Sequence, residues 1–428
     1  MFSKERLIKE IDFCKPFEGI CPMELADKLT ALAEIGKTNQ GGITRFPYTE
    51  EEERAKLLFK SWMEDIGLQV REDAIGNLFG RLEGEDKTLP VVLTGSHLDS
   101  VPNGGAFDGP LGVLSSLFAI KSIKNSGQKI TRSIELVVFV DEEGSRFKNG
   151  LFGSRVMMGE VEEGDLASFQ DEQGKILYDV MKNNKYYPNK IKEAHRAPED
   201  IYAFLEVHIE QGKKLEKGHK NIGVVSGISG PAVISITFVG ETNHAGNTPM
   251  EFRKDTVAAA AAFILEVEKA PRKFSETAVA TIGKINVYPN GTNVIAGKTE
   301  IVLDARDVDE EAREKMLKYL RDTAEEIAKS REISVDFQEM LKIDPVIISD
   351  KMQSIISSAA DRSGLTSVSL PSGAAHDAMT LGRYVSSGMI FVPSLNGKSH
   401  SPEEWTSLPD CVNGVQVLKE SLIILANE

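Results

Sequence analysis

Histidines and carboxylates recur at the ends of short apolar runs in this 428-residue sequence, where they could bind metal ions. The first pair, His97 and Asp99, directly follows the apolar run 91–94. In an extended segment, residues two apart face the same side. The Asp99 carboxylate could therefore accept the second imidazole N–H while the other ring nitrogen binds a metal. Alone, however, His-x-Asp is more often only a polar strand end.

Two acidic turns follow along the chain. Asp108 lies in a glycine-rich turn before an apolar segment, where it could simply cap a helix. Asp141, Glu142 and Glu143 follow the apolar run 134–140. Because adjacent carboxylates repel one another, we expect a cation close by unless this turn is fully solvated. Glu143 could then bind a metal while Glu142, pointing elsewhere, acts as a general base on water.

Two further histidines also follow apolar runs: His208 comes after 203–207 and His400 after 389–392. Each alone is more typical of a structural, hydrogen-bonded histidine. Five residues of this kind could converge as ligands: His97, Asp108, Glu143, His208 and His400. Nitrogen and oxygen ligands without sulfur suit two divalent ions such as Zn²⁺ or Mn²⁺, with Co²⁺ or Ni²⁺ also possible. A bridging carboxylate would hold such ions about 3.5–4 Å apart.

Other polar residues could contact a ligand. Arg306 ends an apolar strand and could clamp a carboxylate through two hydrogen bonds, although a surface salt bridge to a neighbouring Asp is at least as consistent with the sequence. His376, in a glycine-rich turn, could line the site or only orient its own loop. His195 and His219 lie in polar, lysine-rich stretches, and we expect both at the surface.

The elements that must position these residues indicate an α/β fold with a mostly parallel sheet flanked by helices. Apolar spacing predicts helices over 4–35 and 50–67. A helix over 111–123 then separates the apolar strands 91–94 and 134–140. Such a crossover places the strands in parallel, and parallel sheets bind ligands beyond the carboxyl ends of their strands.

From about residue 216 the order of elements changes to β-α-β-β-α-β, the split βαβ arrangement of an independent domain. Its expected elements are strands at 233–239, 278–287, 299–305 and 333–337 and helices at 255–269 and 310–330. A helix at 349–363 and a terminal helix from about 410 would return to the first sheet. We therefore expect a catalytic domain formed by 1–215 and 339–428, with 216–338 inserted into it.

The composition limits the partners. With 50 Lys+Arg against 65 Asp+Glu, the formal charge of −15 disfavours nucleic acid and anionic membranes. No apolar run is long enough to span a membrane, and the N-terminus lacks an apolar export signal. The cysteines, Cys14, Cys21 and Cys411, are too scattered for a disulfide framework, and we expect them to be buried. A cytoplasmic protein is indicated.

Six motifs, taken in order, resemble those of a known family. They are residues 95–101, 104–109, 141–144, 208–212, 244–246 and 399–402. The chain is similar over essentially its whole length to the hydantoinase/carbamoylase-type amidases, which include N-carbamoyl-L-amino-acid hydrolases and allantoate amidohydrolases. These belong to the aminoacylase/carboxypeptidase superfamily of two-metal hydrolases. The resemblance implies a zinc-exopeptidase-like catalytic domain and an inserted ferredoxin-like domain that forms a homodimer.

The resemblance also implies roles for individual residues. One ion would be held by His97, Asp108 and His208, and the other by Asp108, Glu143 and His400. Glu142 corresponds to the general base and Asp99 to the carboxylate behind a metal ligand. Residues corresponding to substrate-binding groups are Gln211, His244, Asn293 and Arg306, with the histidine supplied by the partner subunit. A histidine at position 208 is typical of the amidase branch, whereas the related peptidases have a carboxylate there.

The expected reaction is hydrolysis of an N-carbamoyl-L-amino acid to the amino acid, carbon dioxide and ammonia. The ions would polarise the ureido carbonyl and lower the pKa of a water molecule, and Glu142 would take the water's proton. His244 is our candidate donor to the oxyanion, an interaction of about 3–4 kcal/mol in comparable sites. The alternatives are an allantoate amidohydrolase, an aminoacylase or peptidase, and a non-catalytic metal-binding dimer. The glutamate at 142 argues against the last, since a purely structural site needs no base.

Overall fold

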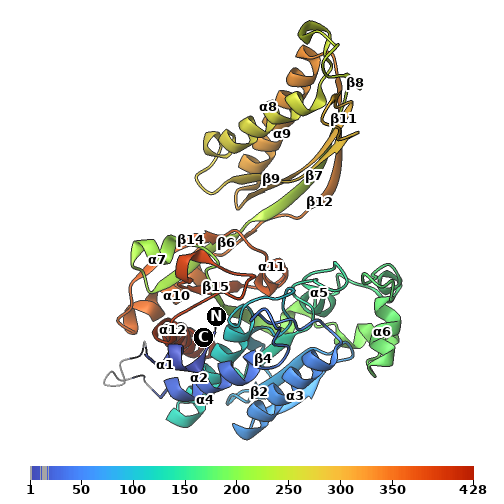
Figure 1. Cartoon of the computed structure of the whole chain (residues 1–428). Helices are drawn as coiled ribbons and strands as arrows, with labels where there is room; N and C mark the ends of the chain where they lie inside the picture. Colours follow the sequence, from blue (N-terminus) through green and yellow to red (C-terminus); the bar gives the residue numbers. More distant parts are fainter. Residues whose placement is uncertain (1, 10, 12–16, 18) are drawn as a thin grey trace. The chain divides into compact units, whose positions relative to one another are not determined.

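The computed structural model describes residues 2–9, 11, 17 and 19–428, and Cys14 lies outside the described residues. The chain forms two compact units (Figure 1). The first contains the chain up to Ser226, Ile348–Leu370 and His376–Glu428, and the second contains Gly227–Ile347 and Pro371–Ala375. Both boundaries fall about ten residues later than the sequence indicated. The first is later because strand β6 (Ile222–Ile228) pairs with β15 (Ser387–Val392) of the first unit.

The first unit is organised around one large sheet with the strand order β1-β2-β4-β3-β5-β15-β6, and β14 also pairs with β6. The short strand β13 extends this sheet from the second unit, because it pairs with the last two residues of β6. Its four central strands, β4 (Ile134–Phe139), β3 (Val91–His97), β5 (Ile201–Ile209) and β15, are mutually parallel. The outer strands β1, β2 and β6 pair in antiparallel fashion. The remaining strands are β1 (Gln69–Glu72), β2 (Leu78–Leu82), β13 (Val346–Ile347) and β14 (Ser367–Ser372). The prediction of an α/β fold with a mostly parallel sheet is confirmed.

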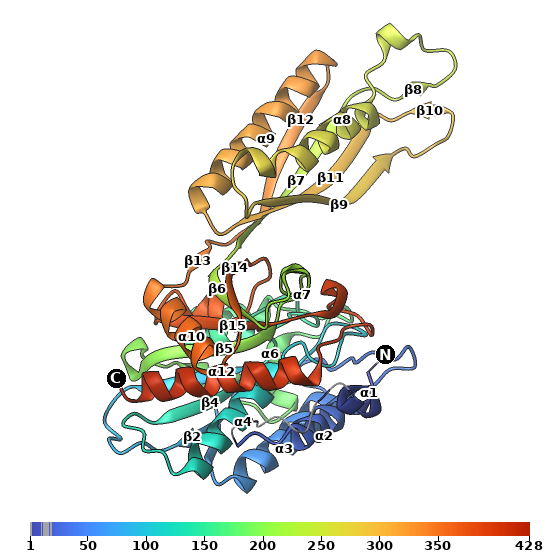
Figure 2. The same ribbon diagram turned by 90° about the vertical axis from the view of Figure 1, so that its left-hand side faces the viewer.

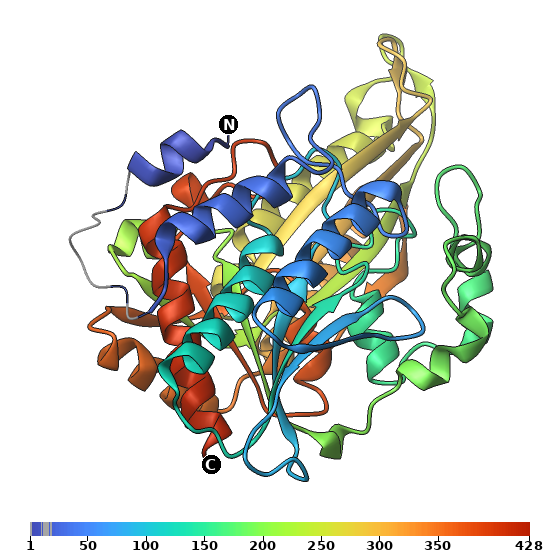
Figure 3. The same cartoon turned by 90° about the horizontal axis from the view of Figure 1, so that it is seen from below.

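Helices cover this sheet. The crossover helix α4 (Pro110–Ser126) is buried along nearly its whole length, since it packs against β3 and β5 as well as against α2 (Pro22–Ala33) and α12 (Leu408–Ala426). Figure 3 shows α2, in blue, alongside α4, in teal. The other helices of the unit are α1 (Lys4–Lys9), α3 (Glu50–Asp65), α5 (Phe152–Met157), α6 (Leu177–Asn183), α7 (Lys214–Gly218), α10 (Asp350–Arg362) and α11 (Asp377–Leu381). No helix in the described ranges is long and apolar enough to cross a membrane.

The polar stretch before β5 forms α6 and three short 3₁₀ helices, at Glu163–Ala167, Pro188–Ala194 and Pro198–Asp200. Helix α6 and the first two 3₁₀ helices pack into an apolar cluster that also contains residues of earlier segments, such as Tyr48 and Phe152. His195 follows the second 3₁₀ helix and is half-buried there, so it is less exposed than the sequence indicated. Cys21, predicted to be buried, is exposed at the start of α2, whereas Cys411 is buried as expected. His219 is exposed, as predicted.

The second unit has the predicted β-α-β-β-α-β order. Its antiparallel sheet, β12-β7-β11-β9, is covered on one face by α8 and α9 (Figure 2). The bounds are β7 (Gly230–Val239), α8 (Thr256–Lys269), β9 (Val279–Tyr288), β11 (Lys298–Asp307), α9 (Glu310–Ser330) and β12 (Ser334–Lys342). A short ribbon of β8 (Asn243–His244) and β10 (Val294–Ile295) completes the unit.

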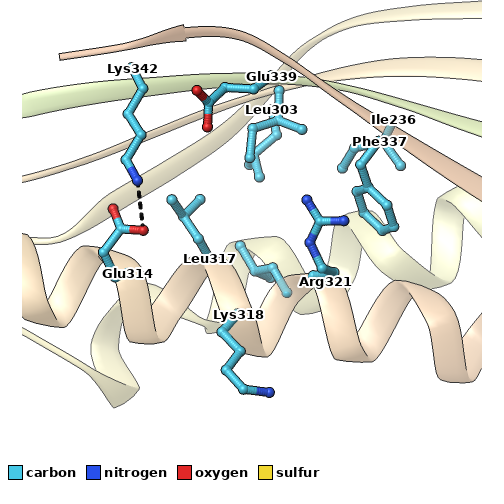
Figure 4. A pocket seen from close by; sticks show the side chains of 11 residues that line it. Ile236, Leu303, Glu314, Leu317, Lys318, Arg321, Phe337, Glu339 and Lys342 are labelled. Atoms are coloured by element: carbon cyan, nitrogen blue, oxygen red, sulfur yellow. Dashed lines mark hydrogen bonds and ion pairs between the residues drawn. The ribbon is translucent and has the colours of Figure 1, made fainter.

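The core of the second unit lies between this sheet and the two helices. Phe238 of β7 and Phe263 of α8 are fully buried there, with ring centroids 6.1 Å apart. Beside this core, a cavity of about 240 Å³ lies between α9 and strands β7, β11 and β12 (Figure 4). Its wall is apolar at Leu317 and charged at Lys342 and Glu314, which form an ion pair at 2.9 Å. The cavity contains none of the predicted metal-binding residues.

Candidate metal centre

The four parallel strands bring the predicted ligands to one edge of the sheet. His97 is the last residue of β3, and His208 is the last residue but one of β5. Glu143 follows the end of β4, and His400 lies in the loop after β15. Because these strands are neighbours and run in the same direction, their carboxyl ends meet at a single edge. The cluster therefore forms because each of these polar residues lies at the carboxyl end of an apolar strand or in the loop after it.

A first group of possible ligands consists of His97, Asp108 and His208, all buried. The Oδ1 atom of Asp108 lies 3.1 Å from Nε2 of His208 and 3.6 Å from Nε2 of His97. Asp108 lies just before α4, where it was also a candidate helix cap. Gly109 occupies the cap position, and its backbone has a positive φ of 78°. The Asp108 side chain instead faces the histidines.

A second group shares Asp108 and adds Glu143 and His400. Nε2 of His400 lies 3.4 Å from Oδ2 of Asp108 and 3.7 Å from Oε2 of Glu143. One oxygen of Asp108 thus faces each group, as a carboxylate that bridges two ions would require. His400 is the most accessible of the five residues, with a half-exposed side chain.

The hydrogen bonds of the two buried histidines test whether the cluster fits metal ions. Nδ1 of His97 lies 3.1 Å from the carbonyl oxygen of Asp99, and Nδ1 of His208 lies 3.0 Å from that of Ile209. A carbonyl can only accept, so Nδ1 carries the proton in each ring and Nε2 presents a lone pair. Both Nε2 atoms are buried, without a hydrogen-bond partner among the described residues. Lone pairs aimed at a shared carboxylate fit a divalent cation.

Asp99 organises the site from behind. Its two carboxylate oxygens accept the backbone N–H groups of Glu142 and Glu143, both at 3.1 Å. Its Oδ1 atom also lies 3.4 Å from Nδ1 of His97. Asp99 therefore connects the end of β3 with the turn after β4. This connection fixes His97, Glu142 and Glu143 relative to one another.

The electrostatics of the cluster favour bound cations. Burial raises the pKa of Glu142 well above its ordinary value, and the neighbouring Glu143 raises it further. Burial and Asp108 raise the pKa of Glu143 to about 7. Burial would also raise the pKa of Asp108, but the histidines around it hold that pKa well below its ordinary value. Several carboxylates packed this closely repel one another, and divalent ions between them would relieve that repulsion.

Glu142 is placed beside the cluster without belonging to either group of ligands. Its Oε2 atom lies 3.7 Å from Nε2 of His97, and the residue is 8% exposed. A carboxylate that adjoins the ligands without being one can accept a proton from a water molecule there.

Two of the predicted substrate-binding residues lie at the cluster. Nε2 of Gln211 donates a hydrogen bond to Oδ2 of Asp108 at 2.7 Å. The His376 ring lies 4.4 Å from the ring of His208, measured between centroids. Burial lowers the pKa of His376 well below its ordinary value, and His208 lowers it further. His376 is therefore a neutral ring in the wall of the site.

The other predicted substrate-binding residues, His244, Asn293 and Arg306, belong to the second unit. Nδ1 of His244 accepts the backbone N–H groups of Gly246 at 3.0 Å and Asn247 at 3.1 Å. Its Nε2 therefore carries the proton, which is the tautomer needed to donate to an oxyanion. Asn293 is exposed, and its backbone carbonyl accepts the N–H of Ala245, so its turn and that of His244 are joined.

Arg306 forms the neighbouring ion pair that the sequence left open. Its Nε and Nη2 atoms donate to the two carboxylate oxygens of Asp304, each at 2.8 Å, and Nη1 donates to the carbonyl of Gly373 at 2.9 Å. A substrate carboxylate would therefore have to share this guanidinium with Asp304. Its role, and those of His244 and Asn293, stay predictions.

Two contacts of the cluster were not foreseen. The Ser399 hydroxyl lies 2.8 Å from Oδ2 of Asp108, and the buried Glu404 carboxylate accepts the backbone N–H of Asp108. Ser399 lies in the same motif as His400, and Glu404 follows two residues after the end of that motif. The sequence offers two adjacent glutamates there, and only the fold shows that Glu403 is exposed and Glu404 is buried.

Fold and cluster together are those of a metal-dependent hydrolase, and comparison with known proteins agrees. The model of peptidase family M20/M25/M40 matches residues 93–423. The N-carbamoyl-L-amino acid amidohydrolase of Geobacillus stearothermophilus is 42% identical over 402 residues, which are 94% of this chain and 98% of that protein. The allantoate amidohydrolase of Bacillus subtilis (strain 168) is 36% identical over 402 residues, 94% of this chain and 97% of that protein.

A solved structure gives the same result. The crystal structure of a hydantoinase/carbamoylase family amidase from Burkholderia multivorans matches with a TM-score of 0.89 at 32% identity, covering 96% of this chain and 100% of that one. The chain therefore belongs to peptidase family M20/M25/M40, and within it to the hydantoinase/carbamoylase-type amidases. The resemblance inferred from six motifs is confirmed.

Proposed function

We propose that this amidase hydrolyses the carbamoyl group of N-carbamoyl-L-amino acids, giving the L-amino acid, carbon dioxide and ammonia. The observation that carries the chemistry is Asp108, with one carboxylate oxygen facing each group of ligands and Glu142 beside them. The substrate class is supported by the 42% identity to the N-carbamoyl-L-amino acid amidohydrolase of Geobacillus stearothermophilus.

Two divalent ions per subunit, Zn²⁺ or Mn²⁺, with Co²⁺ or Ni²⁺ as alternatives, are the cofactors we propose. His97, Asp108 and His208 would hold one ion, and Asp108, Glu143 and His400 the other. When bound, such ions act as Lewis acids on the ureido carbonyl and make water more acidic. The two histidines support this assignment. In His97 and His208, Nδ1 is hydrogen-bonded to a backbone carbonyl, so the lone pair of Nε2 is available to bind a metal.

The chain's own residues would then carry the proton and orient the substrate. Glu142 accepts the proton of the attacking water and returns it to the leaving nitrogen. His244 of the partner subunit donates its Nε2 hydrogen to the carbonyl oxygen as negative charge develops there. Arg306 pairs with the amino-acid carboxylate, while Gln211, Asn293 and His376 contact the rest of the substrate.

We also propose a homodimer formed through the second unit, in the cytoplasm. Strand β9 lies at an edge of its sheet, so one side of its backbone is available for pairing. Its Val279 and Ile285 side chains are each 51% exposed, and Leu265 on the adjoining helix α8 is 57% exposed. Exposed apolar side chains beside an open strand edge suit a second copy of the same surface.

The test is turnover of defined substrates by the purified, metal-loaded protein. We expect ammonia from N-carbamoyl-L-amino acids, little from their D-enantiomers, and none after the ions are removed by a chelator. The 36% identical allantoate amidohydrolase makes allantoate the main alternative. Faster turnover of allantoate would overturn the proposed substrate but not the chemistry. If amino acids were released from N-acyl or peptide substrates alone, the protein would instead be an aminoacylase or peptidase. If none of these substrates were turned over, it would be a non-catalytic binding protein.

A further inference from the structure

Glu404 connects two loops that are far apart in the sequence. Its Oε1 atom accepts the backbone N–H of Phe107 at 2.8 Å and of Asp108 at 3.1 Å, across sequence separations of 297 and 296 residues. The residue is 2% exposed. A buried carboxylate held by two backbone amides fixes the peptide that carries Asp108.

The second oxygen of Glu404 reaches the loop that carries His400. The Ser399 hydroxyl lies 2.9 Å from Oε2 of Glu404 and 2.8 Å from Oδ2 of Asp108. Ser399 directly precedes His400, whose backbone has a positive φ of 53°. Glu404 and Ser399 thus set the spacing between the Asp108 carboxylate and the His400 ring.

A glycine on the Asp108 loop makes room for this contact. A Cβ atom built at Gly105 would lie 2.0 Å from Oε1 and 2.4 Å from Oε2 of Glu404. Any side chain at position 105 would therefore displace the carboxylate from the amides it accepts. The loop is shaped to receive Glu404.

We propose that Glu404 is a positioning residue that holds Asp108 and His400 at the spacing required by the second ion. The inference rests on the two-ion site proposed above. His97 and His208 lie on strands of the sheet, so they keep their places without Glu404. His400 lies on a loop with a half-exposed side chain, so its distance to Asp108 depends on this link. Loss of Glu404 should therefore weaken one ion much more than the other.

The test is calorimetric titration of the metal-free protein with Mn²⁺, with folding checked by circular dichroism. Removing a residue that hydrogen-bonds to a metal ligand typically lowers the metal affinity by about 10–100-fold. We expect Glu404→Ala to weaken the binding of one of the two ions by at least about tenfold and that of the other by less than about threefold. Glu404→Gln keeps an oxygen that can accept both amides, and it should retain most of the affinity. Gly105→Ala should act like Glu404→Ala, because it displaces the same carboxylate.

Glu135→Ala is the matched control, since Glu135 is an equally buried glutamate that pairs with Arg71 and Arg196 and contacts none of the proposed ligands. It should lower stability and leave both affinities unchanged. Unchanged affinities in folded Glu404→Ala or, if that variant does not fold, in Gly105→Ala would overturn the role of Glu404 alone. A single ion in the unaltered protein would overturn the two-ion site together with it.

Discussion

Replacing Glu142 by glutamine removes the proposed base and changes little else. Glutamine has nearly the same shape but cannot accept the proton of water. Glu142 adjoins the ligands, 3.7 Å from Nε2 of His97, and belongs to neither group. A general base contributes about 10²–10⁴ to the rate, which corresponds to about 3–5 kcal/mol of activation free energy. We expect kcat to fall by that factor while KM and metal content stay near their original values.

The assay is steady-state release of ammonia from an N-carbamoyl-L-amino acid, with metal content measured on the same sample by mass spectrometry. Glu135→Gln is the control, because it alters a buried glutamate at the far end of strand β4, the end opposite Glu142. It should leave kcat unchanged. The reasoning is refuted if Glu142→Gln retains full kcat with its ions bound. A fall in kcat that parallels a loss of ions would instead make Glu142 a ligand.

Three further predictions concern the second unit and the stability of the fold. His244→Ala should lower kcat by about 10²–10³, as expected for one oxyanion donor, without changing metal content. Phe263→Ala, at a fully buried position, should lower the unfolding free energy of the second unit by about 3–5 kcal/mol in urea titrations and leave metal affinity unchanged. Burial raises the pKa of Glu52 to about 7. The unfolded chain releases the Glu52 proton near the ordinary, lower pKa of a glutamate, whereas the folded, metal-free protein keeps this proton up to about pH 7. The free energy of unfolding should therefore fall, by up to about 3 kcal/mol, as pH rises from the lower pKa to the higher one. Glu52→Gln should remove this part of the pH dependence.

Each of these has a result that would contradict it. For His244, an unchanged kcat would mean that another group donates to the oxyanion. For Phe263, a destabilisation below about 1 kcal/mol would mean that the core closes around the gap. For Glu52, identical pH profiles for variant and original protein would mean that its carboxylate titrates normally.

The sequence anticipated that the candidate ligands would lie close together, because four of them, His97, Glu143, His208 and His400, lie at the end of an apolar strand or in the loop after it. Short apolar runs such as 91–94 and 134–140 identify central parallel strands, and the polar residues after them must meet at one edge of the sheet. For Asp108 the sequence allows two interpretations, because a helix cap explains a carboxylate before α4 as well as a metal ligand does. Only the distances to His97 and His208 decide between the two interpretations.

Features that depend on distant partners escaped prediction. Strand β6, which moved the unit boundary, has two glycines and obtains its partner, β15, from a segment more than 150 residues away. Similarly, the burial of Glu404 depends on the amides of Phe107 and Asp108, which no local pattern reveals. The pairing of Arg306 with Asp304 was one of two possibilities, because the i, i+2 spacing on a strand permits a salt bridge as readily as it leaves the guanidinium free.

The central claim, that five residues converge on a pair of cations, is tested most directly by anomalous diffraction from crystals grown with Mn²⁺ or Zn²⁺. The account predicts two peaks about 3.5–4 Å apart, with Asp108 between them. His97 and His208 should contact one ion, and Glu143 and His400 the other, at about 2.0–2.2 Å. A single peak, or peaks remote from Asp108, would contradict the account.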